Sequence, residues 1–351
     1  MLFRSYTVSV TDANDQTPTY SASDTTPNIN EGTTAVETSI AITDTDTGDS
    51  NTCTLAGDDS EDFTCTVTAT AYTLAFTSAP DYEAPGSDAS SNDYAVTVTI
   101  SDGTNTGATI SYTVTVDDTN DQAPTYSSSD TTPNINEGTT AIETLTVTDT
   151  DSGDVNACTL AGDDSEDFTC TVSGDSVSLA FTSAPDYETP GSDASSNDYA
   201  VTVTISDGTN TGSTISYTVT VDDTNDQTPS YTAGSTTISV DEGITANIDS
   251  FAITDTDTTG TLACTESGND ADDFDCAISS GTLTITWTAT PDYDSATDSD
   301  TDNVYAYTIT VGDGTNSAAS TTYAVTVDDT NDQTPTYSSS DTTPNINEGT
   351  T

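Results

Sequence analysis

The chain has 351 residues, with 60 acidic side chains, one arginine, no lysine and no histidine, for a formal charge of −59. This charge excludes nucleic acids and anionic membrane surfaces as electrostatic partners, because both are bound through Lys and Arg. No stretch approaches the roughly 18 apolar residues of a membrane-spanning helix, so we expect no membrane insertion in this segment.

Long sequence repeats divide the chain. Residues 23–34 return unchanged at 129–140 and 340–351, and residues 54–67 are identical to 159–172. A fixed period of this kind is typical of an array of similar domains. We therefore expect the last strand (residues 5–10) and linker of a preceding repeat at 1–18, whole repeats at 19–122, 123–227 and 228–333, and the first strand of a following repeat at 334–351.

An acidic chain of low hydrophobicity is often disordered, but the apolar residues here alternate with polar ones, which indicates strands. Each repeat has seven such segments. In the first repeat they are residues 28–31 and the segments around Ile40 and Ile42, Cys53 and Leu55, Phe63 to Val67, Tyr72 to Phe76, Tyr94 to Ile100, and Ile110 to Val116. Seven alternating strands in about 105 residues predict a Greek-key β-sandwich. The expected fold class is therefore all-β, with seven-stranded Greek-key β-sandwiches in tandem as a linear rod.

Six cysteines fall as one pair in each repeat, with partners twelve positions apart: Cys53 and Cys65, Cys158 and Cys170, Cys264 and Cys276. A zinc site is a poor alternative because it needs four close ligands and the chain has no histidine. One pair per domain predicts a disulfide and an oxidising compartment. A reduced, buried pair is the remaining alternative.

Five acidic motifs recur in a fixed order within the repeats. They are an Asn-Glu-Gly or Asp-Glu-Gly segment, an Asp-x-Asp segment, an Asp-Tyr-Glu segment (Asp-Tyr-Asp in the third repeat), a Ser-Asp-Gly or Gly-Asp-Gly turn, and the linker Asp-x-Asn-Asp-Gln. Their order resembles that of the cadherin repeat family over essentially the whole chain. The resemblance implies Ca²⁺ between successive domains. The upstream domain would supply the Glu and the Asp-x-Glu pair, and the downstream domain the Asp-x-Asp pair and the late Asp.

The matched motifs give two full junctions and two half-junctions. The first junction contains Glu31, Asp81, Glu83, Asp118, Asn120, Asp121, Asp149, Asp151 and Asp207. The second contains Glu137, Asp186, Glu188, Asp223, Asn225, Asp226, Asp255, Asp257 and Asp313. The half-junction at the start contains Asp12, Asn14, Asp15, Asp44, Asp46 and Asp102. The half-junction at the end contains Glu242, Asp292, Asp294, Asp329, Asn331 and Asp332.

The donor chemistry supports calcium independently. Ca²⁺ takes six to eight oxygen ligands, whereas Mg²⁺ keeps its waters and Zn²⁺ or Cu²⁺ would want His or thiolate. The oxygens at each junction exceed the need of one ion, so two or three Ca²⁺ per junction are implied. The chain departs from the family pattern where the linker ends in Gln and where Asp294 replaces a longer Glu. Trp287 aligns with Phe76 and Phe181, which predicts a place in the core.

These features predict a protein that is not an enzyme, since His and Lys are missing and every carboxylate pair recurs at every junction. We expect an extracellular or cell-surface repeat array in which Ca²⁺ stiffens a stalk or fibril, with neighbouring repeats as partners and self-assembly into a fibril as an option. The alternative is the extender region of a surface adhesin. No Asn-x-Ser/Thr acceptor occurs, so glycans would sit on Ser or Thr. The loop acids Asp58, Asp59, Glu61 and Asp62 are expected to be ordinary solvated surface.

Overall fold

The computed structural model describes residues 3–48, 50–153 and 155–338. Within these ranges the regular structure consists of strands and single-turn 3₁₀-helices, and no α-helix occurs. None of the helices in the described part is long and apolar enough to cross a membrane.

The first repeat forms two four-stranded sheets. Its strands are β1 (Thr19–Tyr20), β2 (Asn28–Asn30), β3 (Ala35–Thr43), β4 (Thr52–Ala56), β5 (Phe63–Val67), β6 (Ala71–Phe76), β7 (Asp93–Ser101) and β8 (Ile110–Asp117), with the 3₁₀-helix η1 (Ser60–Asp62) between β4 and β5. One sheet has the order β1-β3-β6-β5 and the other β2-β8-β7-β4. β2 runs parallel to β8, so the segment that carries Glu31 lies beside the strand that leads into the linker.

The chain divides into two compact units, and the boundary passes through the second repeat. The first unit comprises the described residues of Met1–Pro133, Thr140–Ser183 and Tyr199–Val219, and the second those of Asn134–Thr139, Ala184–Asp198 and Thr220–Thr351. Each of the two internal linkers, residues 117–122 and 222–227, therefore lies wholly inside one unit, together with the acidic motifs predicted to surround it.

In the second repeat, the first unit holds a three-stranded sheet, β10-β13-β12, and the strands β11, β14 and β15. The strands are β9 (Asn134–Asn136), β10 (Ala141–Thr146), β11 (Ala157–Ala161), β12 (Phe168–Ser173), β13 (Ser176–Phe181), β14 (Asp198–Ser206) and β15 (Ile215–Asp222), with η2 (Ser165–Asp167) before β12. β15 continues into the second unit, where its end pairs in parallel with β9.

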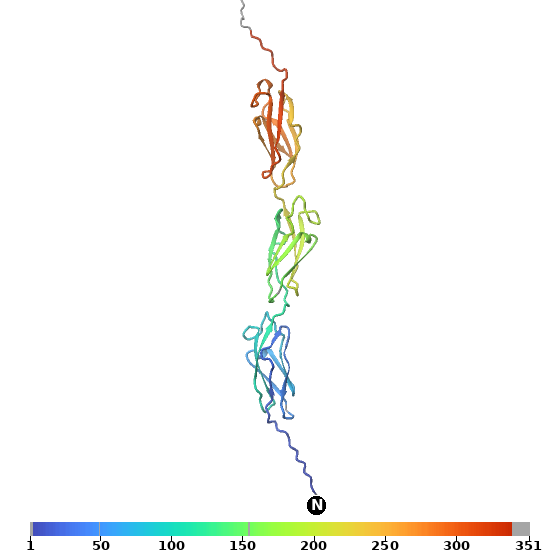
Figure 1. The fold of residues 1–351 in the computed structure, drawn as a ribbon, viewed down its shortest axis with the longest axis vertical. Coiled ribbons are helices and arrows are strands. Elements are labelled where there is room, and N and C mark those ends of the chain that lie inside the picture. Colours follow the sequence, from blue (N-terminus) through green and yellow to red (C-terminus); the bar gives the residue numbers. More distant parts are fainter. Residues whose placement is uncertain (1–2, 49, 154, 339–351) are drawn as a thin grey trace, which may run out of the picture. The chain divides into compact units, whose positions relative to one another are not determined.

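The third repeat belongs to the second unit and again has two four-stranded sheets, β16-β18-β21-β20 and β17-β23-β22-β19. Its elements are β16 (Ser230–Tyr231), β17 (Thr237–Asp241), β18 (Asp249–Thr254), β19 (Ala263–Ser267), η3 (Ala271–Asp273), β20 (Phe274–Ser279), β21 (Thr282–Trp287), η4 (Tyr293–Ser295), β22 (Val304–Gly312) and β23 (Thr321–Asp328). Figure 1 shows these strands as one body of sheets in yellow to red.

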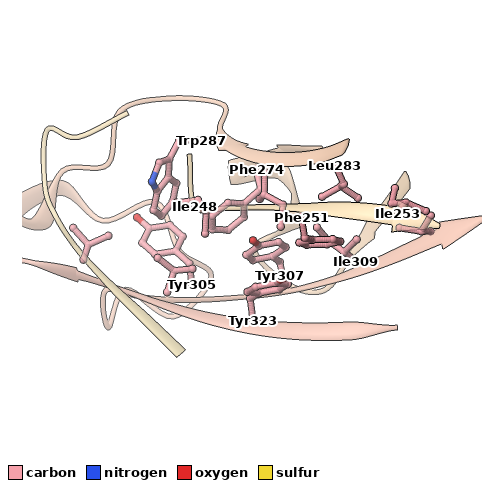
Figure 2. Close-up of a cluster of buried hydrophobic side chains, with 14 residues drawn as sticks. Ile248, Phe251, Ile253, Phe274, Leu283, Trp287, Tyr305, Tyr307, Ile309 and Tyr323 are labelled. Carbon is pink, nitrogen blue, oxygen red and sulfur yellow. The ribbon is translucent and has the colours of Figure 1, made fainter. Parts of the chain in front are cut away.

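The core of each repeat is built by the alternating rows that the sequence indicates. In the first repeat Tyr94, Val96, Val98 and Ile100 are all buried, and they pack against the row of Tyr72, Leu74 and Phe76. In the third repeat Trp287 is buried among Phe274 and Tyr305, as Figure 2 shows, with ring centroids 4.5 Å and 5.0 Å away. The predicted place of Trp287 in the core is thereby confirmed.

The three predicted disulfides are present: Cys53–Cys65, Cys158–Cys170 and Cys264–Cys276. Each joins two strands of different sheets, such as β4 and β5 in the first repeat. Each cysteine is in phase with the apolar row of its strand, so the sulfurs point between the two sheets.

The seven predicted strands of the first repeat correspond to β2 to β8, and the all-β tandem-sandwich class is confirmed. The sequence reading missed the two-residue strands β1 and β16 and the single-turn helices η1 to η4. Residues 5–10 carry no strand in the structure, and their assignment to the last strand of a preceding repeat stays a prediction. The strand expected in residues 334–351 falls mainly outside the described residues.

Candidate metal centres at the linkers

Glu31 fastens the first linker to the first repeat. Its carboxylate is buried and accepts hydrogen bonds from the backbone N–H of Tyr82 at 2.8 Å and of Thr119 at 2.8 Å, and from the hydroxyl of Thr119 at 3.1 Å. Tyr82 is the middle residue of the Asp-Tyr-Glu motif. Glu31 therefore draws the start of the linker toward the pair Asp81 and Glu83.

The other end of the same linker is tied to the second repeat. The backbone N–H of Ser152 donates to Oδ2 of Asp118 at 2.6 Å, and the backbone N–H of Gln122 donates to Oδ2 of Asp151 at 2.7 Å. The side-chain amide of Gln122 donates to Oδ1 of Asp121 at 2.7 Å. The Gln that ends the linker thus holds two acidic side chains in place.

Asp207 is fixed by the tight turn after β14. Its Oδ1 accepts the backbone N–H groups of Thr209 and Asn210, both at 2.7 Å, while the side chain of Asn210 donates to Oδ1 of Asn120 in the linker at 2.7 Å. Burial would raise the pKa of Asp207, but the N–H groups of Asn210 and Thr209 bring it below its ordinary value. Asp207 is therefore a carboxylate that stays ionised.

These supports gather carboxylates from the first repeat, the linker and the second repeat. Carboxylate oxygens of Glu31, Asp81 and Glu83 lie within 4.8 Å of one another, and so do those of Glu83, Asp121 and Asp151. Glu83 belongs to both groups, so it joins the acids of the first repeat to those of the linker and the second repeat. Three anionic oxygens at this separation repel one another strongly unless a cation lies among them.

The buried oxygens test whether the residues fit a metal. Among the described residues, fifteen buried carboxylate oxygens have no hydrogen-bond partner, and thirteen of them lie at predicted ligand positions. They belong to Asp44, Glu83 (both oxygens), Asp118, Asp149, Asp151, Asp207, Glu188 (both oxygens), Asp223, Asp255, Asp257 and Asp313. Because a buried charge without a partner is costly, and Ca²⁺ takes carboxylate oxygens, the donor set fits a calcium site.

The second linker repeats this arrangement inside the second unit. Oxygens of Glu137, Glu188 and Asp223 approach within 4.8 Å, as do those of Glu188, Asp226 and Asp257, and a third group joins Asp255, Asp257 and Asp313. Glu137 accepts the N–H of Tyr187 and of Thr224, as Glu31 does in the first repeat. Of the remaining predicted residues, Asp186 is exposed and Asn225 donates to the backbone carbonyl of Asp313 at 3.3 Å.

Both half-junctions are assembled in the same way from the residues on one side. At the start, the N–H of Thr47 donates to Asp12, that of Gln16 to Asp46, and Asn105 to Asn14 beside Asp102. At the end, Glu242 accepts the N–H groups of Tyr293 and Thr330. Asp15 and Asp332 each accept their neighbouring Gln side chain, and Asp292 accepts the N–H of Asp294. Glu348, in the following repeat, lies outside the described residues.

Electrostatics single out Glu83 and Glu188. Burial raises the pKa of Glu83 to about 7, and the charges of Glu31, Asp118 and Asp151 act in the same direction. Burial likewise raises the pKa of Glu188 to about 7, with Glu137, Asp223 and Asp257 adding to the shift. These two carboxyls resist ionisation in a metal-free junction, and a bound cation would remove that resistance.

One sequence expectation about loop acids is wrong. Asp58 and Glu61 are exposed, as expected, but Asp59 is only 4% exposed. Its two oxygens accept the backbone N–H of Asp88 at 2.7 Å and of Ala95 at 2.6 Å. Asp62 is partly buried as well, and burial raises its pKa. The cause is a close approach of this turn to β7. Gly57, in the turn, has a φ of +112°, and a Cβ at this position would lie 2.9 Å from the carbonyl oxygen of Ala95 in β7.

Sequence reasoning also missed the asparagines that connect the late Asp turn to the linker. Asn105, Asn210 and Asn316 each donate a side-chain hydrogen bond to a linker Asn at distances of 2.9, 2.7 and 3.5 Å. The sequence does contain a signal for these residues, because each of the three asparagines directly follows a repeated Asp-Gly-Thr and is the same in every repeat.

Comparison with solved structures shows the same fold as tandem cadherin domains. The chain aligns over 92% of its length with protocadherin gamma B2 extracellular cadherin domains 1–5 (TM-score 0.61, 21% identity), covering 62% of that chain. It aligns over 91% with the protocadherin gamma B4 extracellular domain (TM-score 0.61, 20% identity), covering 51% of it. Over 90% it aligns with mouse cadherin-23 EC22–24, covering all of that chain (TM-score 0.56, 21% identity).

The chain thus spans between half and two thirds of the length of the two protocadherin structures. No protein-family model matches the sequence, and no curated protein matches it by sequence. The comparisons establish a cadherin-like tandem-repeat fold, in agreement with the expectation from the motifs.

Proposed function

We propose that the chain is part of an extracellular array of calcium-binding structural repeats, in which Ca²⁺ held at the linkers fixes each domain to the next. The observation that carries the proposal is the position of Glu83. Both of its oxygens are buried without a hydrogen-bond partner, and it belongs to two carboxylate groups that include a linker residue and a residue of the following repeat.

The residues around the first linker have distinct parts in this proposal. Glu83, Asp121 and Asp151 would hold a cation at the linker. Asp118, in the linker, and Asp149, in the second repeat, would offer their buried, unpartnered oxygens as further ligands. A bound Ca²⁺ would supply the positive charge that the chain itself lacks. Glu31 orients the linker from one side by accepting the backbone N–H of Thr119. Asn210, in the turn that holds Asp207, orients it from the other side through its side-chain hydrogen bond to Asn120.

Calcium would then increase both the stiffness of the linkers and the stability of the folded repeats. Without a cation, acidic side chains of consecutive repeats repel one another at the linker. With it, the same side chains become a shared attachment, and metal bound only to the native arrangement stabilises that arrangement by mass action. Two or three ions per junction follow from the number of donor oxygens, since one Ca²⁺ takes at most eight.

The three disulfides support a place outside the cytosol, because such bonds persist in oxidising compartments. The nearly identical repeats favour a stalk or fibril body, whose partners are neighbouring repeats and further copies. An extender region of a surface adhesin would use the same calcium sites. Ordered filaments of the purified chain would favour the fibril, and a ligand-binding domain elsewhere in the protein would favour the adhesin.

The proposal is tested by following the full chain in Ca²⁺ and in EDTA. We expect EDTA to lower the melting temperature and to shorten the maximum dimension measured by small-angle X-ray scattering, since freed linkers bend. Scattering curves that coincide in Ca²⁺ and EDTA, together with equal melting temperatures, would contradict it. Mg²⁺ at the same ionic strength is the control for general charge screening.

A further inference from the structure

The loop between η4 and β22 in the third repeat differs in charge from its counterparts. Asp298, Asp300 and Asp302 stand where the first repeat has Ser87, Ala89 and Ser91, and where the second has Ser192, Ala194 and Ser196. None of the three aspartates belongs to a linker motif. This loop is therefore an acidic feature that the proposed junctions leave unexplained.

In the first and second repeats a serine stands at the first position of the loop and makes neutral hydrogen bonds. The buried hydroxyl of Ser87 donates to the carbonyl of Ser91 at 2.7 Å and accepts the N–H of Ser91 at 3.0 Å. Ser192 makes the same two contacts with Ser196. A neutral serine is therefore sufficient at the first position of this loop in two repeats.

In the third repeat a carboxylate occupies that buried position. Asp298 is 3% exposed, and its Oδ2 accepts the N–H of Asp302 at 2.8 Å. Its Oδ1 is buried and has no hydrogen-bond partner. Apart from the junction residues, only Asp298 and Glu266 carry a buried carboxylate oxygen without a hydrogen-bond partner in the described part of the chain.

The unpartnered carboxylate faces two others. Asp298 and Asp302 both approach the carboxylate of Asp300, and together they raise the pKa of Asp300, with the contact to Asp298 the larger cause. Asp300 and Asp302 are exposed, so the group is open to solution. Nearby Asp270 cannot compensate, because it is also acidic and its oxygens already accept the N–H groups of Ser299 and Ala306. The only basic side chain in the sequence is Arg4, which belongs to the other unit.

We propose that Asp298, Asp300 and Asp302 form an additional binding site for a hard divalent cation, of the Ca²⁺ class, that is particular to the third repeat. The buried oxygen of Asp298 would be its anchor, and the two exposed carboxylates would close over the ion. Three carboxylates spaced two residues apart supply oxygen ligands only, which suits Ca²⁺. The site lies inside one repeat, so it stabilises the loop rather than a linker.

The test uses the full chain and a loop variant that copies the other repeats, Asp298→Ser/Asp300→Ala/Asp302→Ser. This variant should fold, because the same residues occupy the loop in two repeats of the chain. Equilibrium dialysis with Ca²⁺ should show one bound ion fewer per chain than in the wild type. The single change Asp300→Asn, at an exposed position, should weaken one site at least tenfold.

The control removes three exposed acids elsewhere, Asp58→Asn/Glu61→Gln/Asp163→Asn, and should bind the wild-type number of ions. Hydrogen exchange of residues 296–304 should be slowed by Ca²⁺ in the wild type and not in the loop variant, while the linker at 222–227 is protected in both. If both loop variants bind as many ions as the wild type with equal affinity, the proposal is overturned, and Asp298 and Asp300 share a proton instead. The test also separates this site from the junctions. If the linkers bind no Ca²⁺ but the loop does, the wild type holds one ion per chain and the loop variant holds none.

Discussion

Glu83 and Asp151 belong to successive repeats, yet a carboxylate oxygen of one lies within 4.8 Å of a carboxylate oxygen of the other. Asp121, in the linker between them, contributes a third oxygen to the same group. The backbone N–H of Gln122 holds Asp151 in this group, and the backbone N–H of Thr119 holds Glu31, which shares the other carboxylate group with Glu83. Such an arrangement is stable only with a cation or a proton among the oxygens.

We expect Asp121→Ala to weaken calcium binding far more than Asp58→Ala. Asp121 supplies one oxygen to the group that it forms with Glu83 and Asp151, whereas Asp58 is exposed in a turn. Surface changes of the second kind usually alter stability by less than about 0.5 kcal/mol. Calorimetric titration of both full-chain variants with Ca²⁺ measures the difference. Wild-type stoichiometry and affinity in Asp121→Ala would contradict the assignment of Asp121 as a calcium ligand.

Asp59→Ala should destabilise the first repeat by roughly 1–3 kcal/mol, because it leaves two backbone donors, of Asp88 and Ala95, without their acceptor. The effect should be independent of calcium, since Asp59 belongs to no junction group. Urea unfolding in EDTA and in Ca²⁺ measures both points, with Asp58→Ala as the exposed neighbour. Equal stability of the two variants would refute the assigned role of Asp59.

Glu266→Leu should stabilise the third repeat by about 1–3 kcal/mol. Glu266 stands where the other repeats have Leu55 and Leu160, and one of its oxygens is buried without a partner. Burial raises the pKa of Glu266 above its value in the unfolded chain. The folded repeat therefore holds the Glu266 proton more tightly than the unfolded chain does. The stability that this proton contributes is fully present below the unfolded pKa of about 4.3 and is lost as the pH rises through the folded pKa.

Thermal melts between pH 4 and 8 check this sign. The gain from Glu266→Leu should be larger at pH 8 than at pH 4, while a Leu55→Met control should show no such dependence. A gain that is the same at both ends of the range would mean that the carboxyl does not titrate in the folded repeat.

Replacing one disulfide, by Cys158→Ala/Cys170→Ala, should lower the stability of the second repeat by roughly 3 kcal/mol in the chain-entropy model, given a separation of twelve residues. Limited proteolysis should then open the second repeat before the first and third. Cleavage of all three repeats at one rate would indicate that the bond adds little.

Much of this fold is predictable from local pattern. The strict alternation of residues such as Tyr94 and Val96 fixes which side of a strand is buried, and the cysteines follow the same phase. The gathering of acids around the linkers is also predictable, because their motifs repeat. Asp59 was not, because its burial depends on the approach of β7, a contact between segments far apart in the sequence. Residues 5–10 have a strand pattern, but pattern alone does not supply a pairing strand.

Calcium bound by the linker carboxylates would be visible in anomalous diffraction from crystals of the full chain grown in Ca²⁺. We expect two or three anomalous peaks at each internal linker, with the carboxylate oxygens of Glu83 and Glu188 beside them. Junction carboxylates without any peak, in crystals that carry Ca²⁺ at saturating concentration, would contradict this expectation.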